Sequence, residues 1–564
     1  MNPFATARLR SGVFCAALLA ILPFSAANAG EQPSVTPGAV QDTIRQQPPQ
    51  APLPLDPSPP LQSGMSREAT APIGPAVRVE SFILNGNDIV PDELLQAELA
   101  RWTGRELTLD GIYAAADALT AFYRAQGYGL AQVTVPAQKI SDGIVELQII
   151  EGRIGAIAVT GNEDYSFEFL KRRLELLTPG RVYTDLGMER GVLLLDDLPG
   201  LSARAVITPG EEFGTSDVLF RITEDSESFS ASVDNYGREE LGEIRVLADA
   251  QFNNLGGFGD ELYIAVLVSE DALLKYGNVS YAVPTGSNGA RLRVTANRAD
   301  YEVSGDLFEE LGITGDNTTY RVDWSYPLLR SRSANMVFTA AGQRFETESF
   351  QDNTLIPANA TELDLLELGL FMNGFLFDNH SWSLSSILAG NGKSNDSTVS
   401  NPQTDAQQAK LRVDGSYGLP FGTGWLFTSR ATYVYSGDPL TDSQKFSLGG
   451  PYSVRGYAPA ELRGDEGAFL SLELRKYFFP GGYPLAGAVF IDGGTATNER
   501  LPGDTVSTSA DLEGELASAG LGLLFSPDGG TYSGAILLAS PIDNHTSPNG
   551  DDDGHVWATF TYRF

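Results

Sequence analysis

Two kinds of hydrophobic pattern divide the chain near residue 225. Before this point, several helix-length segments carry apolar residues three to four positions apart, as in Ile112–Tyr123. Beyond it the helical period stops, and segments of about ten residues alternate aromatic or aliphatic residues with Ser, Thr, Asn and Arg. The pattern predicts an α+β region followed by a long all-β region.

The last predicted strand shows the alternation most clearly. One face carries Val556, Ala558, Phe560, Tyr562 and Phe564, and the other carries Trp557, Thr559, Thr561 and Arg563. One face can therefore meet lipid and the other a hydrated lumen. At about 21 residues per strand and connection, residues 226–564 would supply about 16 antiparallel strands, which leaves an interior pore. Soluble β-sandwiches alternate in the same way but rarely end in an aromatic strand, so the pattern favours a transmembrane barrel.

Residues 76–151 and 152–225 form an internal repeat of one α+β unit. Each segment reads as strand, helix, helix, strand, strand, with apolar residues at helical spacing in the middle and alternating residues at both ends. Equivalent turns are marked by Gly86-Asn87 and Gly161-Asn162.

The N-terminal part predicts an export signal and a linker. Residues 1–29 have the layout of a secretory signal peptide, because Arg8 and Arg10 precede an apolar run that ends in a small-residue triplet. Within residues 30–75, Ala39–Gln47 contains no helix breaker and is interpreted as a short helix, with disorder as the alternative. The stretch Gln46–Pro75 holds nine prolines, which predict an extended, semi-stiff linker.

Charge and composition exclude several classes of function. The formal net charge is −34, and no cluster of Lys and Arg could bind a phosphate backbone, so a nucleic-acid partner is not expected. The single cysteine, Cys15, lies inside the signal peptide. No later stretch of about 18 apolar residues could form a membrane-spanning helix, whereas a β-barrel spreads its apolar residues over alternate positions.

We find no motif typical of an enzyme, a cofactor site or a metal site. The histidines are His380, His545 and His555, with no H-E-x-x-H motif and no cysteine partner. No G-x-S-x-G nucleophile turn occurs between a strand and a helix. Asn549–Gly554 resembles the start of a calcium loop, but Phe560 stands where the closing Glu would be, so a solvated loop is the better interpretation.

Several longer motifs follow one another along the chain. Leu119–Asn162 contains the steps YRAQGY and VPAQ, a DG turn and a closing EG, and Val233–Gly237 reads VDNYG. The most specific motifs come later, as Val454-Arg455-Gly456-Tyr457 and Phe490-Ile491-Asp492-Gly493-Gly494. In this order they resemble the POTRA modules, the first barrel hairpin, the VRGY loop tip and the F-x-D-x-G strand of TpsB proteins. These are the outer-membrane transporters of two-partner secretion, the haemolysin activation and secretion family.

The resemblance implies an architecture and a location. Two POTRA modules, 76–151 and 152–225, would lie in the periplasm, and the barrel, 226–564, in the outer membrane of a Gram-negative cell. In the family an N-terminal helix can plug the pore, a role for which 30–75 is the candidate. The terminal Phe564 would act as the signal for the barrel-assembly machinery.

The resemblance also implies a pair of motifs inside the barrel. A loop near 445–466, between barrel strands 11 and 12, would fold into the lumen and bring Arg455 to Asp492. A guanidinium in a narrow lumen loses water and needs a carboxylate that accepts two parallel hydrogen bonds, and Gly456 would allow a tight tip. The alternative interpretation is a solvated pore arginine and an aspartate in a turn.

The function implied is secretion of an unfolded partner protein, a TpsA-type exoprotein resembling a haemolysin or adhesin β-helix. The modules would capture it by strand addition at their open sheet edges, beside helices at 112–126 and 185–197. No nucleotide-binding loop is visible, so the partner's folding outside would drive transport. An assembly factor that inserts other barrels is a second interpretation, and a passive porin a third. The two modules and the YRAQGY block favour a secretion transporter over an assembly factor, and the presence of the modules argues against a porin.

Overall fold

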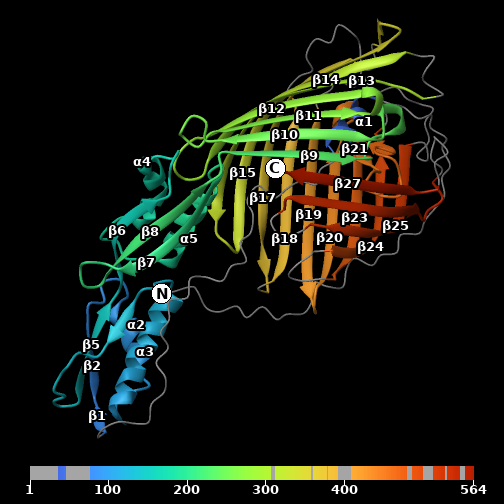
Figure 1. The fold of residues 1–564 in the computed structure, drawn as a ribbon. Coiled ribbons are helices and arrows are strands. Elements are labelled where there is room, and N and C mark those ends of the chain that lie inside the picture. Colours follow the sequence, from blue (N-terminus) through green and yellow to red (C-terminus); the bar gives the residue numbers. More distant parts are fainter. Residues whose placement is uncertain are drawn as a thin grey trace.

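The computed structural model describes residues 36–45, 76–305, 312–356, 360–377, 379–391, 408–478, 485–499, 512–526, 530–545 and 553–564. The predicted signal peptide, 1–29, and the predicted linker, Gln46–Pro75, lie outside these ranges. Two α+β modules extend in a row from one end of a closed β-barrel (Figure 1). Within the described ranges, no helix is both long and apolar enough to cross a bilayer.

The first module packs two helices on a three-stranded sheet. In chain order it contains β1 (Val77–Val79), β2 (Ser81–Asn85), α2 (Asp92–Leu99), β3 (Arg105–Leu107), α3 (Leu109–Ala125), β4 (Gln132–Thr134) and β5 (Ile144–Ile150). The sheet order is β2-β5-β4, with β2 parallel and β4 antiparallel to β5. The side chain of Thr108 caps α3 by accepting a hydrogen bond from the Gly111 amide, and Ile112, Leu119 and Tyr123 are buried against the sheet.

The second module repeats this arrangement. It contains β6 (Arg153–Thr160), α4 (Phe167–Lys171), the 3-10 helix η1 (Arg172–Leu177), α5 (Asp185–Asp196), β7 (Leu201–Pro209) and β8 (Thr215–Glu224), with sheet order β6-β8-β7. Residues 167–177 do not form one continuous helix: α4 is followed directly by η1, and the backbone leaves helical geometry at Leu174 within η1.

The barrel has 16 antiparallel strands, as the sequence predicts. They are β9 (Glu227–Asp234), β10 (Arg245–Asn253), β11 (Glu261–Ser269), β12 (Leu274–Pro284), β13 (Arg291–Glu302), β14 (Ile313–Arg330), β15 (Ala334–Gln351), β17 (Thr361–Leu376), β18 (His380–Gly390), β19 (Ala409–Phe421), β20 (Trp425–Ser436), β23 (Glu466–Tyr477), β24 (Leu485–Thr497), β25 (Glu513–Phe525), β26 (Tyr532–Pro541) and β27 (His555–Arg563). The short β16 (Thr354–Leu355) only extends the edge of β15. Each barrel strand pairs with the next one along the chain.

The ring closes between its first and last strands. β27 pairs with β9 over Thr559–Arg563 and Ser230–Asp234, a shorter ladder than that of any neighbouring pair of barrel strands. Asn235 extends the seam, since its side-chain amide donates to the Val556 carbonyl at 2.7 Å and its Oδ1 accepts from the Ala558 amide at 2.7 Å.

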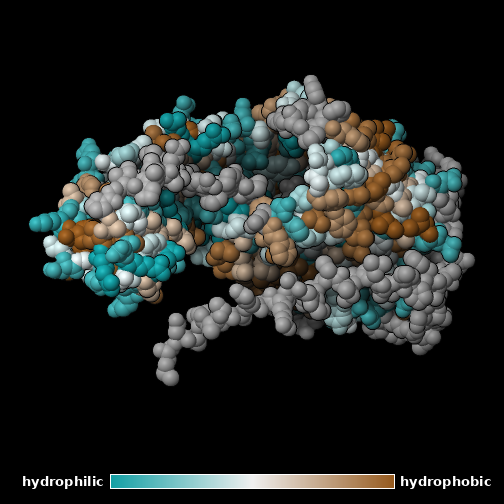
Figure 2. Space-filling view, turned by 90° about the horizontal axis from the view of Figure 1, so that it is seen from below, coloured by the Kyte–Doolittle hydropathy of each residue, from teal (hydrophilic) through white to brown (hydrophobic). Residues whose placement is uncertain are grey.

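The two faces of the strands differ as the alternation predicts. On β27, Val556 is 56% exposed on the outer surface, whereas Trp557 is 3% exposed and points inward. Figure 2 shows apolar residues gathered over the barrel, while the modules are mostly hydrophilic. Aromatic side chains collect at the barrel end that carries the modules, where Phe421 stacks on Trp425 and Tyr562 meets Phe564 edge to face. Such a band is typical of a membrane interface.

The second module contacts the barrel through charged side chains. Arg330, at the end of β14, donates from Nε and Nη2 to the two carboxylate oxygens of Asp197 at 2.9 and 2.8 Å. A second contact follows in the turn between β14 and β15, where the carboxylate of Glu189 of α5 accepts a hydrogen bond from the Arg332 backbone amide. A bidentate pair fixes orientation as well as distance, so the second module has a defined position on the barrel.

Candidate functional site

The loop between β20 and β23 folds into the lumen. It carries the 3-10 helix η6 (Asp442–Gln444) and a small hairpin of β21 (Phe446–Leu448) and β22 (Leu462–Gly464). Leu448, Val454 and Tyr457 are buried against Phe469 of β23 and Leu516 of β25. A Cβ on Gly494 would lie 2.7 Å from Leu448, so the last residue of the F-x-D-x-G motif makes room for the base of the loop.

Arg455 lies at the tip of the loop and binds the barrel wall. Its Nε and Nη2 donate to the two oxygens of Asp492 on β24 at 2.7 and 2.8 Å. Its backbone amide adds a third hydrogen bond to the same carboxylate at 3.3 Å. The two residues are 3% and 1% exposed. The structure thus shows the arginine paired rather than solvated, and Asp492 within a strand rather than in a turn.

A second carboxylate, which the sequence did not predict, also binds the guanidinium of Arg455. Nη1 of Arg455 donates to Oε2 of Glu473 on β23 at 2.6 Å, and Nη2 donates to Oγ of Ser471 at 3.2 Å. Arg475 forms a further ion pair with Glu473. Glu473 lies two residues after Ser471 and so shares its inward face, but many residues share that face and nothing in the alternation singles it out.

The neighbouring motif residues hold the arginine in place. Its guanidinium lies 3.3 Å from the ring centroid of Phe490, and Trp557 Nε1 donates to the Arg455 carbonyl at 2.7 Å. A Cβ on Gly456 would approach Cβ of Ser518 to 2.6 Å, so only glycine fits between the tip and the wall. Tyr457 donates a hydrogen bond from its hydroxyl to Asp543. The VRGY tip and the inward-facing residues of the second motif, Phe490, Asp492 and Gly494, therefore lie together in the lumen.

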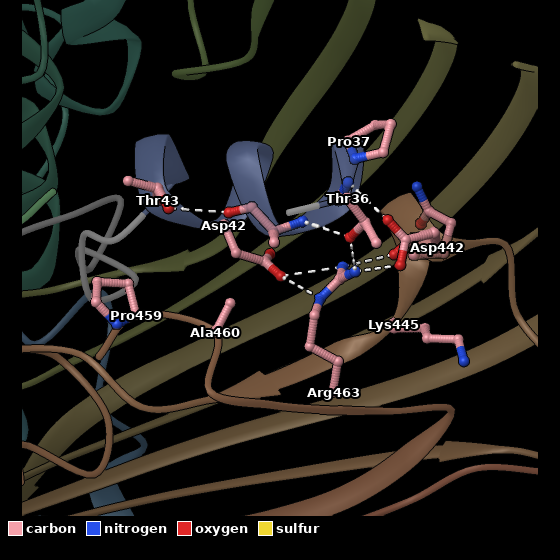
Figure 3. Close-up of polar contacts among 12 residues, drawn as sticks. Thr36, Pro37, Asp42, Thr43, Asp442, Lys445, Pro459, Ala460 and Arg463 are labelled. Carbon is pink, nitrogen blue, oxygen red and sulfur yellow. Dashed lines mark hydrogen bonds and ion pairs between the residues drawn. The ribbon is translucent and has the colours of Figure 1, made fainter. Parts of the chain in front are cut away.

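Helix α1 (Pro37–Arg45) also lies inside the barrel, beside the loop (Figure 3). The sequence predicted a helix at Ala39–Gln47, and the observed one begins two residues earlier; residues 46 and 47 lie outside the described ranges. Val40 is buried against apolar residues of the barrel wall and of the turns at its far end, among them Leu241, Leu267 and Leu274. The predicted helix thus has a place in the lumen that its own sequence did not reveal.

Polar contacts hold α1 at both ends. Arg463 of β22 pairs with Asp42 at 3.2 Å and donates to Thr36 Oγ1 at 2.9 Å, and it also binds Asp442 of the loop. From the other side, Arg245 of β10 donates to the Thr43 carbonyl at 2.7 Å. Arg463 therefore connects the helix and the inward loop through one guanidinium, as Figure 3 shows.

Phe564 lies at the module-side end of the barrel with its side chain 77% exposed on the outer surface. Its amide donates to the Phe229 carbonyl at 3.0 Å, so the last residue also takes part in the closing seam. This position leaves its ring free to meet lipid.

Comparison with known proteins identifies the family. A family model described as haemolysin secretion/activation protein ShlB/FhaC/HecB matches residues 214–525, more than half of the chain. The chain belongs to this family. A model of the ShlB-type POTRA domain matches residues 77–152 of this TpsB transporter.

Known relatives are similar over most of their length. The chain is 27% identical to the heme/hemopexin transporter protein HuxB of Haemophilus influenzae strain 86-028NP, covering 87% of each chain. It is 25% identical to the outer membrane transporter CdiB of Escherichia coli O6:K15:H31, covering 87% of this chain and 83% of that protein. The solved structure of CdiB from Escherichia coli has the same fold, with a TM-score of 0.71, 22% identity, and coverage of 93% and 95%.

Membership gives the coarse function. The family consists of outer-membrane transporters rather than enzymes, and its members secrete partner proteins. This TpsB transporter is therefore an outer-membrane β-barrel with POTRA domains, and a secreted exoprotein is its implied partner. Among the described residues, no group of three or more His, Cys, Asp or Glu side chains is placed to bind a metal ion.

Proposed function

We propose that this transporter captures an unfolded exported protein in the periplasm and passes it through the barrel without nucleotide hydrolysis. The partner's class, a TpsA-type exoprotein, follows from the family, and its folding outside the cell would supply the direction of transport. In this proposal α1 closes the lumen at rest. The cluster of Arg455, Asp492 and Glu473, which we call the Arg455 centre, holds the inward loop in the shape that transport needs. The lipid-facing barrel would be inserted by the cell's barrel-assembly machinery.

The observation that carries the capture step is the open edge of β7 in the second module. In an antiparallel pair, alternate residues direct both backbone groups away from the partner strand. The Ala203 amide points away from β8, since it donates to the Asp196 carboxylate. The ladder between β7 and β8 has no register shift, so the backbone N–H and C=O groups of Ala205 and Ile207 also point away from β8. Within the described part of the chain no group pairs with these two residues at that edge. An extended peptide could add there as a further strand.

The other sheet edges are less available. In the first module the Val133 amide of β4 is bonded to Oγ1 of Thr120, and the Phe82 carbonyl of β2 accepts from Gln96. At β6 of the second module, Ile154 exchanges backbone hydrogen bonds with Gly180 and Arg181. The edge of β7 is therefore our candidate for the site of strand addition.

Replacing Ile207 by proline should lower secretion of the partner about tenfold. The substitution removes an outward amide and places a ring where an added strand would lie, and a lost backbone hydrogen bond plus the steric block is worth on the order of 1 to 2 kcal/mol. The measurement is the rate at which the secreted partner protein reaches the medium.

The matched control is Ile207→Ala, which removes the same side chain from the module core but keeps the amide. Secretion by the alanine variant should stay near the wild-type rate. Equal losses in both variants would mean that packing at Ile207 matters and that strand addition at β7 does not.

Removing the hold on α1 should open the pore. Arg463→Ala deletes the ion pair with Asp42 and the hydrogen bond to Thr36, so the helix should leave the lumen more often. In planar bilayers we expect a higher mean conductance than for the wild type, approaching that of a variant lacking residues 30–75. Arg412→Ala is the control, because it removes a lumenal charge that pairs with Asp414 and not with α1. An unchanged conductance in the deletion variant would exclude the plug role.

A further inference from the structure

A pocket of about 170 Å³ lies where the second module meets the barrel. It is formed by η1 and α5 on the module side and by the turn between β12 and β13 on the barrel side. Its polar lining consists of Arg172, Arg173, Glu175, Arg190, Ser287 and Asn288. We call it the junction pocket. Three arginines against one carboxylate make it locally cationic in a chain whose net charge is −34.

Arg173 is the most informative of these residues because it is buried without a carboxylate partner. Its side chain donates to the Phe169 carbonyl at 3.2 Å and, weakly, to the Gly286 carbonyl at 3.5 Å, and it lies 4.0 Å from the Phe169 ring centroid. Among the described residues no carboxylate forms an ion pair with it. Buried arginines are normally paired, so this one lacks the anion that would offset its loss of water.

The surroundings of Arg173 increase this imbalance. Burial lowers the pKa of Arg173 to about 10; the Tyr165 hydroxyl opposes this effect, whereas Arg172 and Arg291 add to it. Arg190 has no side-chain hydrogen bond or ion pair with any described residue, and the guanidinium of Arg172 lies 5.6 Å from the Phe169 ring centroid. The single carboxylate of the pocket, Glu175, accepts a hydrogen bond from the Ser287 hydroxyl at 3.5 Å. An anion could thus add to the pocket without displacing an existing ion pair.

The pocket lies at the depth of a membrane surface. The turn that lines it begins at Thr285, whose hydroxyl oxygen accepts a hydrogen bond from Trp324 Nε1 at 3.0 Å. Trp324 stacks on Tyr326 with ring centroids 5.7 Å apart, and both belong to the aromatic band at the module-side end of the barrel. Tryptophan and tyrosine mark the level of the lipid headgroups. The phospholipid headgroups at this level carry phosphodiester groups.

We propose that the junction pocket binds a phosphate group, supplied by the headgroup of an anionic phospholipid in the leaflet that faces the modules. Guanidinium groups match phosphate oxygens with paired hydrogen bonds, and Ser287 and Asn288 offer further donors. A bound headgroup would neutralise Arg173 and join η1 to the β12–β13 turn. The lipid would thus be a structural ligand of the module–barrel junction, a role separate from capture and transport.

The test uses the full-length protein in nanodiscs of phosphatidylethanolamine with and without phosphatidylglycerol. Native mass spectrometry should show phosphatidylglycerol retained by the wild type, and retention about a hundredfold weaker in Arg172→Ala/Arg190→Ala, because each of the two arginines would supply at least one hydrogen bond between charged groups, worth about a factor of ten. Both arginines lie at the surface of the module, so the variant should fold, which heat-modifiable mobility would verify. The control is Arg204→Ala/Arg221→Ala, which removes the same number of charges from the exposed face of the β7–β8 sheet in the same module. Its retention of phosphatidylglycerol should equal that of the wild type.

A second arm separates lipid from free anion. Inorganic phosphate is titrated into the detergent-solubilised, delipidated protein by calorimetry. Binding of phosphatidylglycerol that depends on Arg172 and Arg190 supports the proposal with lipid as the source, and binding of inorganic phosphate alone supports the pocket but replaces the source. Absence of both in the wild type, or equal loss in the control variant, overturns the proposal.

Discussion

Replacing Arg455 by alanine is expected to give a barrel that assembles in the membrane but secretes its partner at a small fraction of the normal rate. The change leaves Asp492 and Glu473 facing each other in the lumen without the arginine that pairs with both, and only the ion pair of Glu473 with Arg475 and the nearby charge of Arg430 offset them among the described residues. Removing one side of a desolvated ion pair costs on the order of 3 to 5 kcal/mol, less where lumen water screens the charges. The loop tip would lose its anchor to β24. Secretion is measured together with heat-modifiable mobility, which reports barrel assembly.

Combined substitutions show whether the lost charge is the cause. Neutralising both carboxylates, as Glu473→Gln/Asp492→Asn, should recover part of the secretion lost in Arg455→Ala, because the unpaired charges disappear. Arg455→Lys should rescue only in part, since an ammonium cannot present two parallel donors. The reciprocal change Arg455→Asp/Asp492→Arg should stay impaired until Glu473 is also neutralised, because the new carboxylate would face Glu473. Arg412→Ala is the lumenal control. Normal secretion by Arg455→Ala at normal membrane levels would exclude a functional role for this centre.

Deleting the modules, residues 77–224, should abolish secretion while the barrel still reaches the membrane. Strand addition supplies binding through main-chain hydrogen bonds, and the deletion removes every sheet edge in the described chain outside the barrel and its inward loop. Secretion of the partner and heat-modifiable mobility of the barrel are measured together. If the truncated barrel secretes at the normal rate, the capture role of the modules is wrong.

A smaller deletion makes the test cleaner. Removing only 77–151 keeps the Arg330–Asp197 contact between the second module and the barrel. Because β7 lies in the second module, this variant should retain part of the secretion activity. A complete loss here, with a folded barrel, would move the capture site to the first module.

How much of this could be predicted from sequence depends on the range of the interactions. The alternation on β27 and the helical period of α3 are local, because each follows from which face of one element meets water, and both predictions are confirmed. The pairing of Arg455 with Asp492 joins residues 37 positions apart. No period encodes it, and only the resemblance to a family placed the two motifs together.

Two other contacts of the lumen could be predicted neither from a sequence period nor from a family motif. Glu473 reaches Arg455 because β23 and β24 are neighbours at one register, which the sequence of β23 alone does not specify. Asp42 reaches Arg463 over 421 positions. The sequence of α1 alone predicts only a short helix, with disorder as the alternative, and its burial follows from partners contributed by the barrel and its inward loop.

The seam between β27 and β9 has a consequence for the order of folding. Every other pair of barrel strands joins neighbours along the chain and can form as a hairpin while the rest is still open. The seam joins Ala231 to Tyr562, so it must wait for the last strand. Until then β9 and the latest strand formed both present unpaired backbone groups, the condition in which β-proteins aggregate with other chains. The shortest ladder of the barrel is thus the last to form, and the time before it closes is when the chain is most exposed to aggregation.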